Sequence, residues 1–275
     1  MVDLIELRRW TDAIEPMIER GEIAPVNRVL VFAETGSTQD AAVRSAAGQP
    51  GLLLLAGRQT AGRGRLGRVW SQAPARGVAA TFVITAPREQ HGVIALAAGV
   101  AVAEAVESCL ANLPSPPALA LRWPNDLVER KTGRKLAGVL IESPGAARDG
   151  TPLLAVGIGV NVLENPDEFP AELRERAASL RMLGGEAARM DVILALARTF
   201  AACTRDALGS DESRRDLLDR WKRRDILTGR PAAFIHDGRR YEGIVTAVLP
   251  DLALRLRLST GSTVDLPATT TSLAS

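Results

Sequence analysis

Uninterrupted apolar runs constrain the fold of this chain more than any other feature. Leu52–Leu55 is a run of four leucines, a pattern typical of a strand that is buried on both faces of a sheet. The segment 91–111 is apolar over a length that suits a long buried helix. Further strands are expected at 29–32, 78–85, 119–122, 136–142 and 153–162, and further helices at 3–20, 37–48, 191–207 and 212–224. Strands mixed with long helices predict an α/β (α+β) layer architecture without fixing the order of its strands.

The pattern changes after about residue 226. Strand-like segments at 232–235 and 241–245 flank Asp237-Gly238, a dipeptide typical of hairpin turns. Leu252, Leu254, Leu256 and Leu258 then alternate with other residues at a period of two, as in a strand with one buried face. We therefore expect two domains, with boundaries at 1–225 and 226–275, the second a small β domain.

Composition excludes several classes of protein. With 46% hydrophobic and 24% charged residues and a net charge of +2, the chain resembles a soluble globular protein and lacks the basic excess of a nucleic-acid binder. The most apolar run, Val93–Val106, is too short to cross a bilayer, and the first residues do not form a signal peptide. Cys109 and Cys203 indicate buried thiols in a reducing, cytoplasmic compartment. With only His91 and His236, a zinc site is not expected.

The segment Gly57–Trp70 is the most informative stretch for function. Its fourteen residues contain four glycines and four arginines, directly after an apolar strand. Glycine lets the backbone approach a ligand closely, and guanidinium groups match phosphates and carboxylates. Trp70 offers a flat surface for a ring. The segment contains neither a P-loop nor a Rossmann fingerprint. A solvated basic loop and an Arg-Gly segment that binds RNA are alternative interpretations from composition alone.

Four segments, in this order, resemble the biotin–protein ligase family and cover residues 34–162. They are 34–39 (ETGSTQ), 62–70 (GRGRLGRVW), the pair 122–127 (RWPNDL) and 134–142 (RKLAGVLIE), and 157–162 (GIGVNV). The resemblance implies a mixed sheet flanked by helices, a catalytic domain like that of class II synthetases, and a small C-terminal SH3-like β-barrel. It also implies a two-step reaction. Biotin and ATP form biotinyl-5′-AMP and pyrophosphate, and a lysine of a biotin carboxyl carrier protein then takes the biotinyl group and releases AMP.

The resemblance assigns roles residue by residue. Four residues are expected to be catalytic: Lys135, Arg63, Arg65 and Asp126. Biotin is expected to contact Ser37, Thr38, Gln39, Gln59, Arg63, Gly64, Arg65, Trp123, Lys135 and Gly138. The nucleotide is expected to contact Arg63, Arg65, Trp70, Asn125, Lys135, Gly159 and Asn161. No metal ligand is assigned, because Mg²⁺ is expected to arrive with ATP, but Asp126 is expected either to orient the acceptor lysine or to help hold that ion. Neither a specific nucleic acid nor a membrane is an expected partner, and the chain is a monomer or a homodimer.

Several of these residues also have plain structural interpretations. Ser37 stands three residues before Asp40 in a capping-box pattern, so it is a helix cap, a biotin ligand or both. Trp123 fits a core position as well as a wall of the biotin site. Asn125 is also a turn residue and Asn161 a strand-end cap. Two other arginines of the loop, Arg58 and Arg68, are expected to stabilise the loop or to face solvent.

Competing functions follow from the same features. A lipoate- or octanoate-transferring ligase shares the expected fold and the carrier-lysine chemistry. Some family members are also repressors, but residues 1–27 have room for about one helix and not for a winged helix-turn-helix domain. The tail 261–266 (GSTVDL) departs from the family's final strand, so we assign no nucleotide role to it.

Overall fold

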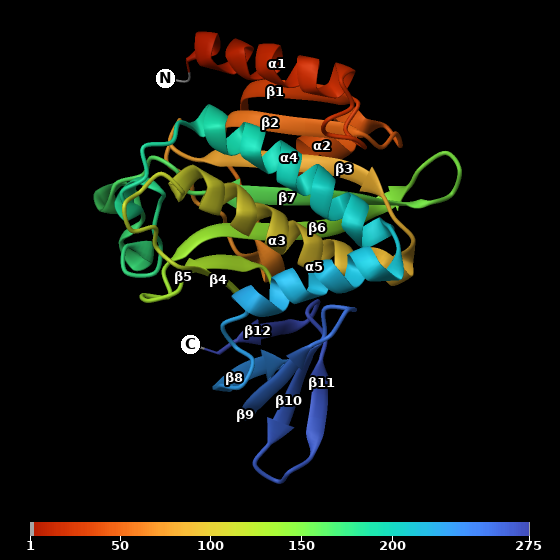
Figure 1. Cartoon of the computed structure of the whole chain (residues 1–275), viewed down its shortest axis with the longest axis vertical. Coiled ribbons are helices and arrows are strands. Elements are labelled where there is room, and N and C mark those ends of the chain that lie inside the picture. The colour runs from red at the N-terminus through yellow and green to blue at the C-terminus, as the bar shows by residue number, and fades with distance from the viewer. Residues whose placement is uncertain (1–2, 275) are drawn as a thin grey trace.

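Two β-sheets organise the computed structural model, which describes residues 3–274 (Figure 1). The larger sheet has seven strands: β1 (Arg28–Thr35), β2 (Leu52–Gln59), β3 (Val78–Thr85), β4 (Leu119–Arg122), β5 (Asp126–Glu129), β6 (Lys135–Ala146) and β7 (Pro152–Val160). The helices are α1 (Leu4–Glu19), α2 (Thr38–Ala46), α3 (His91–Leu110), α4 (Arg189–Leu208) and α5 (Asp211–Arg224). The α/β layer architecture predicted from the sequence is confirmed.

The seven strands lie in the order β1-β2-β3-β7-β6-β5-β4. β1 and β2 are parallel, and the other neighbours are antiparallel, so the sheet is mixed, as the family resemblance implies. Strand β5 was not predicted, because four residues after Pro124 are too few to show a period. It forms a tight hairpin with β4, in which Arg122 lies opposite Asp126.

The four-leucine run divides its side chains between two apolar cores. Leu53 and Leu55 belong to the large core on the face covered by α1, α3, α4 and α5. Leu52 and Leu54 belong to a smaller core under α2 on the opposite face. Burial on both faces, which the run predicts, is therefore confirmed, because successive side chains of a strand point to opposite faces.

Helix α3 is long and apolar enough to raise the question of a membrane span. The segment Arg88–Leu110 passes that test by length and composition, and 72% of an 18-residue apolar stretch within it is buried inside the molecule. Helix α4 packs along α3, and the ring of Phe200 in α4 stacks on Phe82 of β3 with 3.9 Å between the ring centroids. Its place in the main core makes α3 a core helix, in agreement with the sequence analysis.

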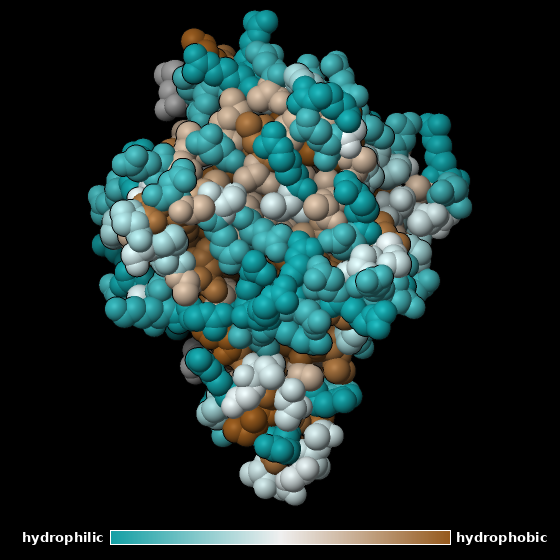
Figure 2. All heavy atoms as spheres, in the orientation of Figure 1, coloured by the Kyte–Doolittle hydropathy of each residue, from teal (hydrophilic) through white to brown (hydrophobic). Residues whose placement is uncertain are grey.

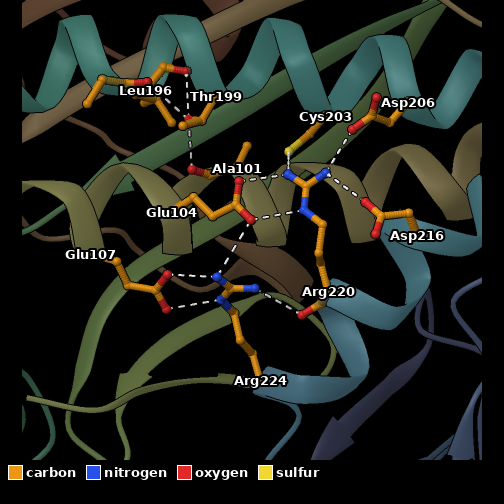
Figure 3. Close-up of polar contacts among 11 residues, drawn as sticks. Ala101, Glu104, Glu107, Leu196, Thr199, Cys203, Asp206, Asp216, Arg220 and Arg224 are labelled. Atoms are coloured by element: carbon orange, nitrogen blue, oxygen red, sulfur yellow. Dashed lines mark hydrogen bonds and ion pairs between the residues drawn. The ribbon is translucent and has the colours of Figure 1, made fainter. Parts of the chain in front are cut away.

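Helix α5 is polar and is held by ion pairs as well as by apolar contacts. Arg220 lies 2.7 Å from Glu104 of α3 and 2.7 Å from Asp206 of α4, and it donates to the Cys203 thiol at 3.1 Å (Figure 3). Arg224 lies 2.7 Å from Glu107 of α3. Hydrophilic atoms cover the band of surface where α5 lies (Figure 2). These pairs join three helices on the outer side of the main core.

The second sheet is antiparallel, with the order β11-β10-β9-β8-β12. Its strands are β8 (Pro231–His236), β9 (Arg239–Val248), β10 (Leu254–Leu258), β11 (Thr263–Leu266) and β12 (Thr271–Leu273). Asp237 and Gly238 have φ of 47° and 75°, as expected for the predicted hairpin. Leu252 lies before β10 with φ 68°, so the alternating pattern begins one leucine earlier than the strand. Within residues 3–274 no pairing joins β11 to β12, and the SH3-like barrel stays a prediction.

Trp123 joins the two sheets. Its side chain is 1% exposed, and its ring packs edge-on against Phe234 of β8 with 5.7 Å between centroids. Its Nε1 donates to the carbonyl of Leu252 at 2.8 Å. The core interpretation of Trp123 therefore describes its contacts better than the biotin-wall interpretation does.

Candidate active site

One cavity of about 710 Å³ brings together every residue that the sequence analysis assigned to a site. It is bordered by the start of α2, the loop after β2, the hairpin between β4 and β5, strands β6 and β7, the segment 169–177 and the C-terminal residues 272–274. The assigned residues on its wall are Ser37, Thr38, Gln39, Gln59, Arg63, Gly64, Arg65, Trp70, Trp123, Asn125, Asp126, Lys135, Gly138, Gly159 and Asn161. Motifs separated by more than a hundred residues thus share one surface.

Glycines form the floor of the cavity where β6 and β7 pair. Gly138 lies opposite Gly159 in the ladder. A Cβ at Gly159 would stand 2.4 Å from the ring of Trp70, and a Cβ at Gly138 would stand 2.9 Å from Lys135 Nζ. Trp70 therefore lies directly against the strand backbones, a contact that only glycine permits. The ammonium of Lys135 lies 5.3 Å from the centroid of the Trp70 ring.

One end of the cavity is a buried, uncharged polar cluster. Gln59 Oε1 accepts hydrogen bonds from Thr38 N at 2.7 Å and Thr38 Oγ1 at 3.0 Å. Gln39 reaches across to β7, where its Nε2 donates to the carbonyl of Ala155 at 2.8 Å. Thr81 Oγ1 lies 3.0 Å from Thr38 Oγ1 and was missed, because it is a single hydroxyl inside an apolar strand. Amides and hydroxyls of this kind suit a neutral polar ligand ring.

Ser37 at this end is a helix cap. Its Oγ accepts from the backbone N–H of Gln39 at 3.2 Å. The capping-box part of the prediction is wrong, because the Asp40 carboxylate turns outward and lies 2.8 Å from Arg63 Nη2. The cap fixes the N-terminus of α2 beside the polar cluster.

The middle of the cavity carries a paired carboxylate. Asp126 Oδ1 lies 2.5 Å from Lys135 Nζ, and Asp126 Oδ2 accepts from Arg122 Nη2 at 2.9 Å. Burial opposes ionisation of Asp126, but Lys135 and Arg122 outweigh it and lower the pKa of that carboxyl. The pairing of β5 with β6 brings the two residues together, because Asp126 stands opposite Gly138 and Lys135 stands opposite Val128. Arg122 was quoted in a motif but not assigned to the site, although its position four residues before Asp126 is a signal for such a pair.

Protein acceptors hold the arginines of the loop. Arg63 donates to both carboxylate oxygens of Glu142, at 3.0 and 2.6 Å, besides its contact with Asp40. Arg65 Nη2 donates to the carbonyl of Thr271 at 3.1 Å and to that of Ala268. Burial lowers the pKa of the Arg65 guanidinium. The loop therefore rests on β6 and on the C-terminal sheet, and an anion would compete with these acceptors for Arg63 and Arg65.

Asn125 and Asn161 make structural contacts. Asn125 Nδ2 donates to the carbonyl of Val139 at 2.7 Å, which fixes the turn between β4 and β5 against β6. Asn161 Nδ2 donates to the carbonyl of Ala178 at 3.0 Å, at the end of β7. Asn161 Oδ1 is buried without a hydrogen-bond partner among the residues that the structure describes. The turn and strand-end interpretations thus hold for both, and the free oxygen leaves Asn161 one acceptor for a ligand.

The segment 169–177 was missed by the sequence analysis. It lacks apolar periodicity and consists of short 3₁₀ turns and loops. Its backbone is tied to the start of β6, because Lys135 N donates to Arg176 O at 2.7 Å and Ala178 N donates to Lys135 O at 2.9 Å. Side-chain patterns carry no signal for backbone contacts of this kind.

The acidic side chains on the cavity wall are ion-paired. No group of three or more His, Cys, Asp or Glu side chains that could hold a metal occurs within residues 3–274. The acidic side chains on the cavity wall are Asp126 and Glu175, and Glu175 pairs with Arg134 at 2.7 Å. Both carboxylates are therefore neutralised by cations of the chain.

Known proteins match this chain over the same motifs. The model of the biotin/lipoate A/B protein ligase family matches residues 31–162. A biotin–[acetyl-CoA-carboxylase] ligase of Mycobacterium tuberculosis is 38% identical over 56% of this chain and 55% of its own length. One of Paracoccus denitrificans is 41% identical over 52% of this chain and 58% of its own length. The alignments thus span little more than half of either relative.

The fold has a close counterpart among solved structures. A biotin protein ligase from Aquifex aeolicus, in complex with biotin and ATP, superposes with a TM-score of 0.73 at 25% identity. The superposition covers 90% of this chain and 98% of that one, so it extends through both sheets. The order of the motifs, the fold and the residues matched by the family model all indicate the same likeness. Over residues 31–162 the chain is similar to the biotin/lipoate A/B protein ligase family.

Proposed function

We propose that this chain is a biotin–protein ligase, which activates biotin with ATP and transfers it to a lysine of a biotin carboxyl carrier protein. The observation that carries the proposal is the cavity itself. A neutral polar end around Gln59 and a cationic centre around Lys135 lie on one wall, joined by a glycine floor. Biotin has a neutral ureido ring at one end and a carboxylate at the other, which fits this polarity. The names of the two curated relatives and the ligands of the Aquifex protein support the same substrates.

In the first step a carboxylate oxygen of biotin attacks the α-phosphorus of ATP. A phosphorus–oxygen bond forms, the bond to the β-phosphate breaks, and pyrophosphate leaves with the electron pair. Two anions must meet, so the chain has to neutralise their repulsion and stabilise the oxygens on phosphorus. Lys135 supplies the central charge, and Arg63 and Arg65 exchange their protein acceptors for ligand oxygens. The reaction needs no nucleophilic side chain, because positioning and electrostatics supply most of the rate enhancement.

In the second step the amine of the carrier lysine attacks the acyl carbon of biotinyl-5′-AMP. A carbon–nitrogen bond forms, the acyl–phosphate bond breaks, and AMP leaves while the amine loses a proton to solvent. Asp126 stays ionised in the cavity, because Lys135 and Arg122 lower its pKa. Its carboxylate is placed to orient the incoming ammonium before that group loses its proton.

The remaining assignments belong to the same proposal. Residues 1–225 form the catalytic domain and residues 226–275 the C-terminal domain. Ser37, Thr38, Gln39 and Gln59 hold the ureido end of biotin, and Trp70, Asn125, Gly159 and Asn161 border the nucleotide. The carrier is that of a carboxylase, and the enzyme works as a monomer or homodimer. A reducing cytoplasm fits Cys109 and Cys203, which are both unpaired.

Pyrophosphate release by the purified protein with MgATP tests the proposal, with biotin, lipoate and octanoate compared. Release with biotin alone supports a biotin ligase. Release with lipoate or octanoate instead would move the substrate within the family. No release with any of the three acids would refute the activity, and salt-dependent RNA binding would be measured next.

A further inference from the structure

A buried guanidinium group lies outside the cavity, behind the loop of residues 58–76 that joins β2 to β3. This segment is called the arginine loop. Arg189, the first residue of α4, is 1% exposed. Its Nε and Nη2 donate to both carboxylate oxygens of Glu6 in α1, at 3.0 and 2.8 Å. Its Nη1 donates to the carbonyl of Gly57 at 3.1 Å and to that of Gly77 at 3.4 Å. A single side chain therefore contacts α1 and both β2 and the start of β3.

Gly57 and Gly77 are the two stems of the arginine loop. The segment between them, 58–76, carries Gln59, all the arginines of the loop and Trp70. The ladder between β2 and β3 ends with the pair Ala56 and Ala79. Just beyond that pair, the Arg189 guanidinium lies between the two backbones and donates hydrogen bonds to the carbonyls of Gly57 and Gly77. The Arg189 side chain is thus the group that bridges the two loop stems directly.

The surroundings of Arg189 leave it little freedom. The Trp10 ring lies 4.6 Å from its Cζ atom, on the core side of α1. Gly77 is packed so closely that an added Cβ would stand 2.8 Å from Glu164 Oε1. Glu164 is fully buried, so the stem region combines a buried cation with a buried carboxyl. Such a site holds one geometry, because any displacement leaves a charged or polar group without partners.

We infer that Arg189 is a positioning residue for the arginine loop. It fixes the distance between the loop stems and thereby places Arg63, Arg65 and Trp70 over the cavity. Through Glu6 it also couples α1 to that loop. Its kinetic consequence rests on the proposed function, whereas its effect on the loop does not.

Hydrogen exchange of the loop in the ligand-free protein tests the inference directly. The loop has backbone hydrogen bonds of its own, from Gly64 N to Arg68 O at 2.7 Å and from Trp70 N to Gly62 O at 2.9 Å. Exchange of these amides reports how often the loop opens. In Arg189→Met both stem carbonyls lose their donor, and we expect exchange to be about tenfold faster, the scale of one lost charged hydrogen bond.

Arg220→Met is the matched control. Arg220 is also a partly buried arginine in an ion-pair network, but it joins α5 to α3 and α4 and contacts no residue of the loop (Figure 3). If loss of a buried ion pair acts only on stability, both variants lower the urea midpoint and neither changes loop exchange. The inference requires faster loop exchange in Arg189→Met alone, at a temperature where both variants are folded. Equal loop exchange in the two variants overturns it.

Arg189→Lys keeps the proposal testable if the methionine variant does not fold. A lysine keeps the positive charge beside Glu6, but its single ammonium lacks the fork that reaches both stems. We expect a smaller loss of stability than in Arg189→Met together with faster loop exchange, and wild-type exchange in this variant overturns the inference.

Activity gives the second readout. With biotin and MgATP, Arg189→Met and Arg189→Lys should lower kcat for pyrophosphate release by about tenfold. The KM for biotin should change less, because the polar end around Gln59 is intact. An unchanged kcat with altered loop exchange would overturn the positioning role. If the wild type releases no pyrophosphate, the proposed function fails, and the exchange comparison still decides whether Arg189 holds the loop.

Discussion

Lys135 concentrates the proposed chemistry in one side chain. Only three of the 34 basic residues are lysines, and Lys135 is the one that lies in the cavity, ion-paired with Asp126. Lys135→Ala should lower the rate of biotin-dependent pyrophosphate release by at least about a hundredfold. The fold should survive, since Asp126 keeps Arg122 as a partner. Lys131→Ala, at an exposed lysine four residues away, is the control and should release pyrophosphate at the wild-type rate.

Glu164 predicts a pH dependence of stability. Burial raises the pKa of its carboxyl to about 7, whereas the same group in the unfolded chain titrates near its ordinary value of 4.5. Between these pH values the folded state binds a proton that the unfolded state does not, so the free energy of unfolding falls as the pH rises. The loss is at most roughly 2–3 kcal/mol between pH 4.5 and pH 7. Stability below pH 4.5 is unaffected by this group.

Urea unfolding at pH 5 and pH 8 measures this contribution. Glu164→Gln removes the titration, so its stability relative to the wild type should improve as the pH is raised. A constant difference between the two proteins at both pH values would show that the Glu164 carboxyl ionises normally in the fold.

At the residue scale, the sequence predicted which residues line the cavity better than it predicted which atoms those residues contact. All of the assigned residues line it, because the motifs that carry them were recognised in order. The carbonyl partners of Arg65 and the hydroxyl of Thr81 were not predictable, since they come from distant segments with no pattern of their own. The same holds for Arg189, whose partners belong to the other end of the chain.

Strand β7 contributes two glycines to the cavity floor, and substitution of each is expected to weaken the binding of a different substrate. A methyl group at Gly159 meets the Trp70 ring at 2.4 Å, whereas one at Gly157 meets Gln39 Oε1 at 2.6 Å. Both glycines lie on the same face, two residues apart. Gly159→Ala should therefore raise the KM for ATP severalfold, and Gly157→Ala should raise the KM for biotin.

Each alanine variant serves as the control for the other. Calorimetric titration with biotin alone should show normal affinity for Gly159→Ala and weaker affinity for Gly157→Ala. Equal losses of biotin and ATP binding in both variants would mean that β7 is distorted as a whole, and the division of the floor into two ends would be wrong.

At the scale of helices and strands, the sequence predicted those elements whose apolar residues repeat at a regular period. Helices α1 and α3 to α5 and strands β3 and β4 appear within two residues of the expected bounds. Strand β2 extends to Gln59, three residues into the expected loop, because its pairing with β1 continues there. Strand β5 and the turns between 163 and 188 were missed. They are short, and their shape comes from contacts with β6 and β7.

Across the whole molecule, Trp123 should govern how the C-terminal sheet docks. Trp123→Phe removes the hydrogen bond to Leu252 and part of the contact with Phe234, which should cost about 1–3 kcal/mol of stability. Biotin affinity should not change if Trp123 is a core residue. Weakened biotin binding in a stable variant would restore the biotin-wall interpretation.

Trp221→Phe is the control for ring size. Trp221 is 2% exposed in α5, and its Nε1 is buried without a partner in the described part of the chain. That variant loses ring volume but no hydrogen bond, so urea unfolding should show a smaller loss than for Trp123→Phe. The difference between the two variants measures the bond that joins the sheets.

The order of the strands was beyond the reach of the sequence. Apolar runs predict that strands are buried, but the same runs fit many orders, and the insertion of β7 between β3 and β6 depends on long-range pairing. The family resemblance supplied the mixed sheet. The closure of the C-terminal sheet into a barrel stays a prediction.

The ion pairs between α5 and its neighbours have a consequence for heating. Hydration of charged groups becomes less favourable as temperature rises, so the cost of burying Arg220 and Arg224 against Glu104 and Glu107 falls. Apolar contacts gain nothing comparable over the same range. The ion pairs that join α5 to α3 therefore contribute a growing share of the stability of this protein as the temperature rises. They keep the helical layer attached to the sheet when other contacts begin to loosen.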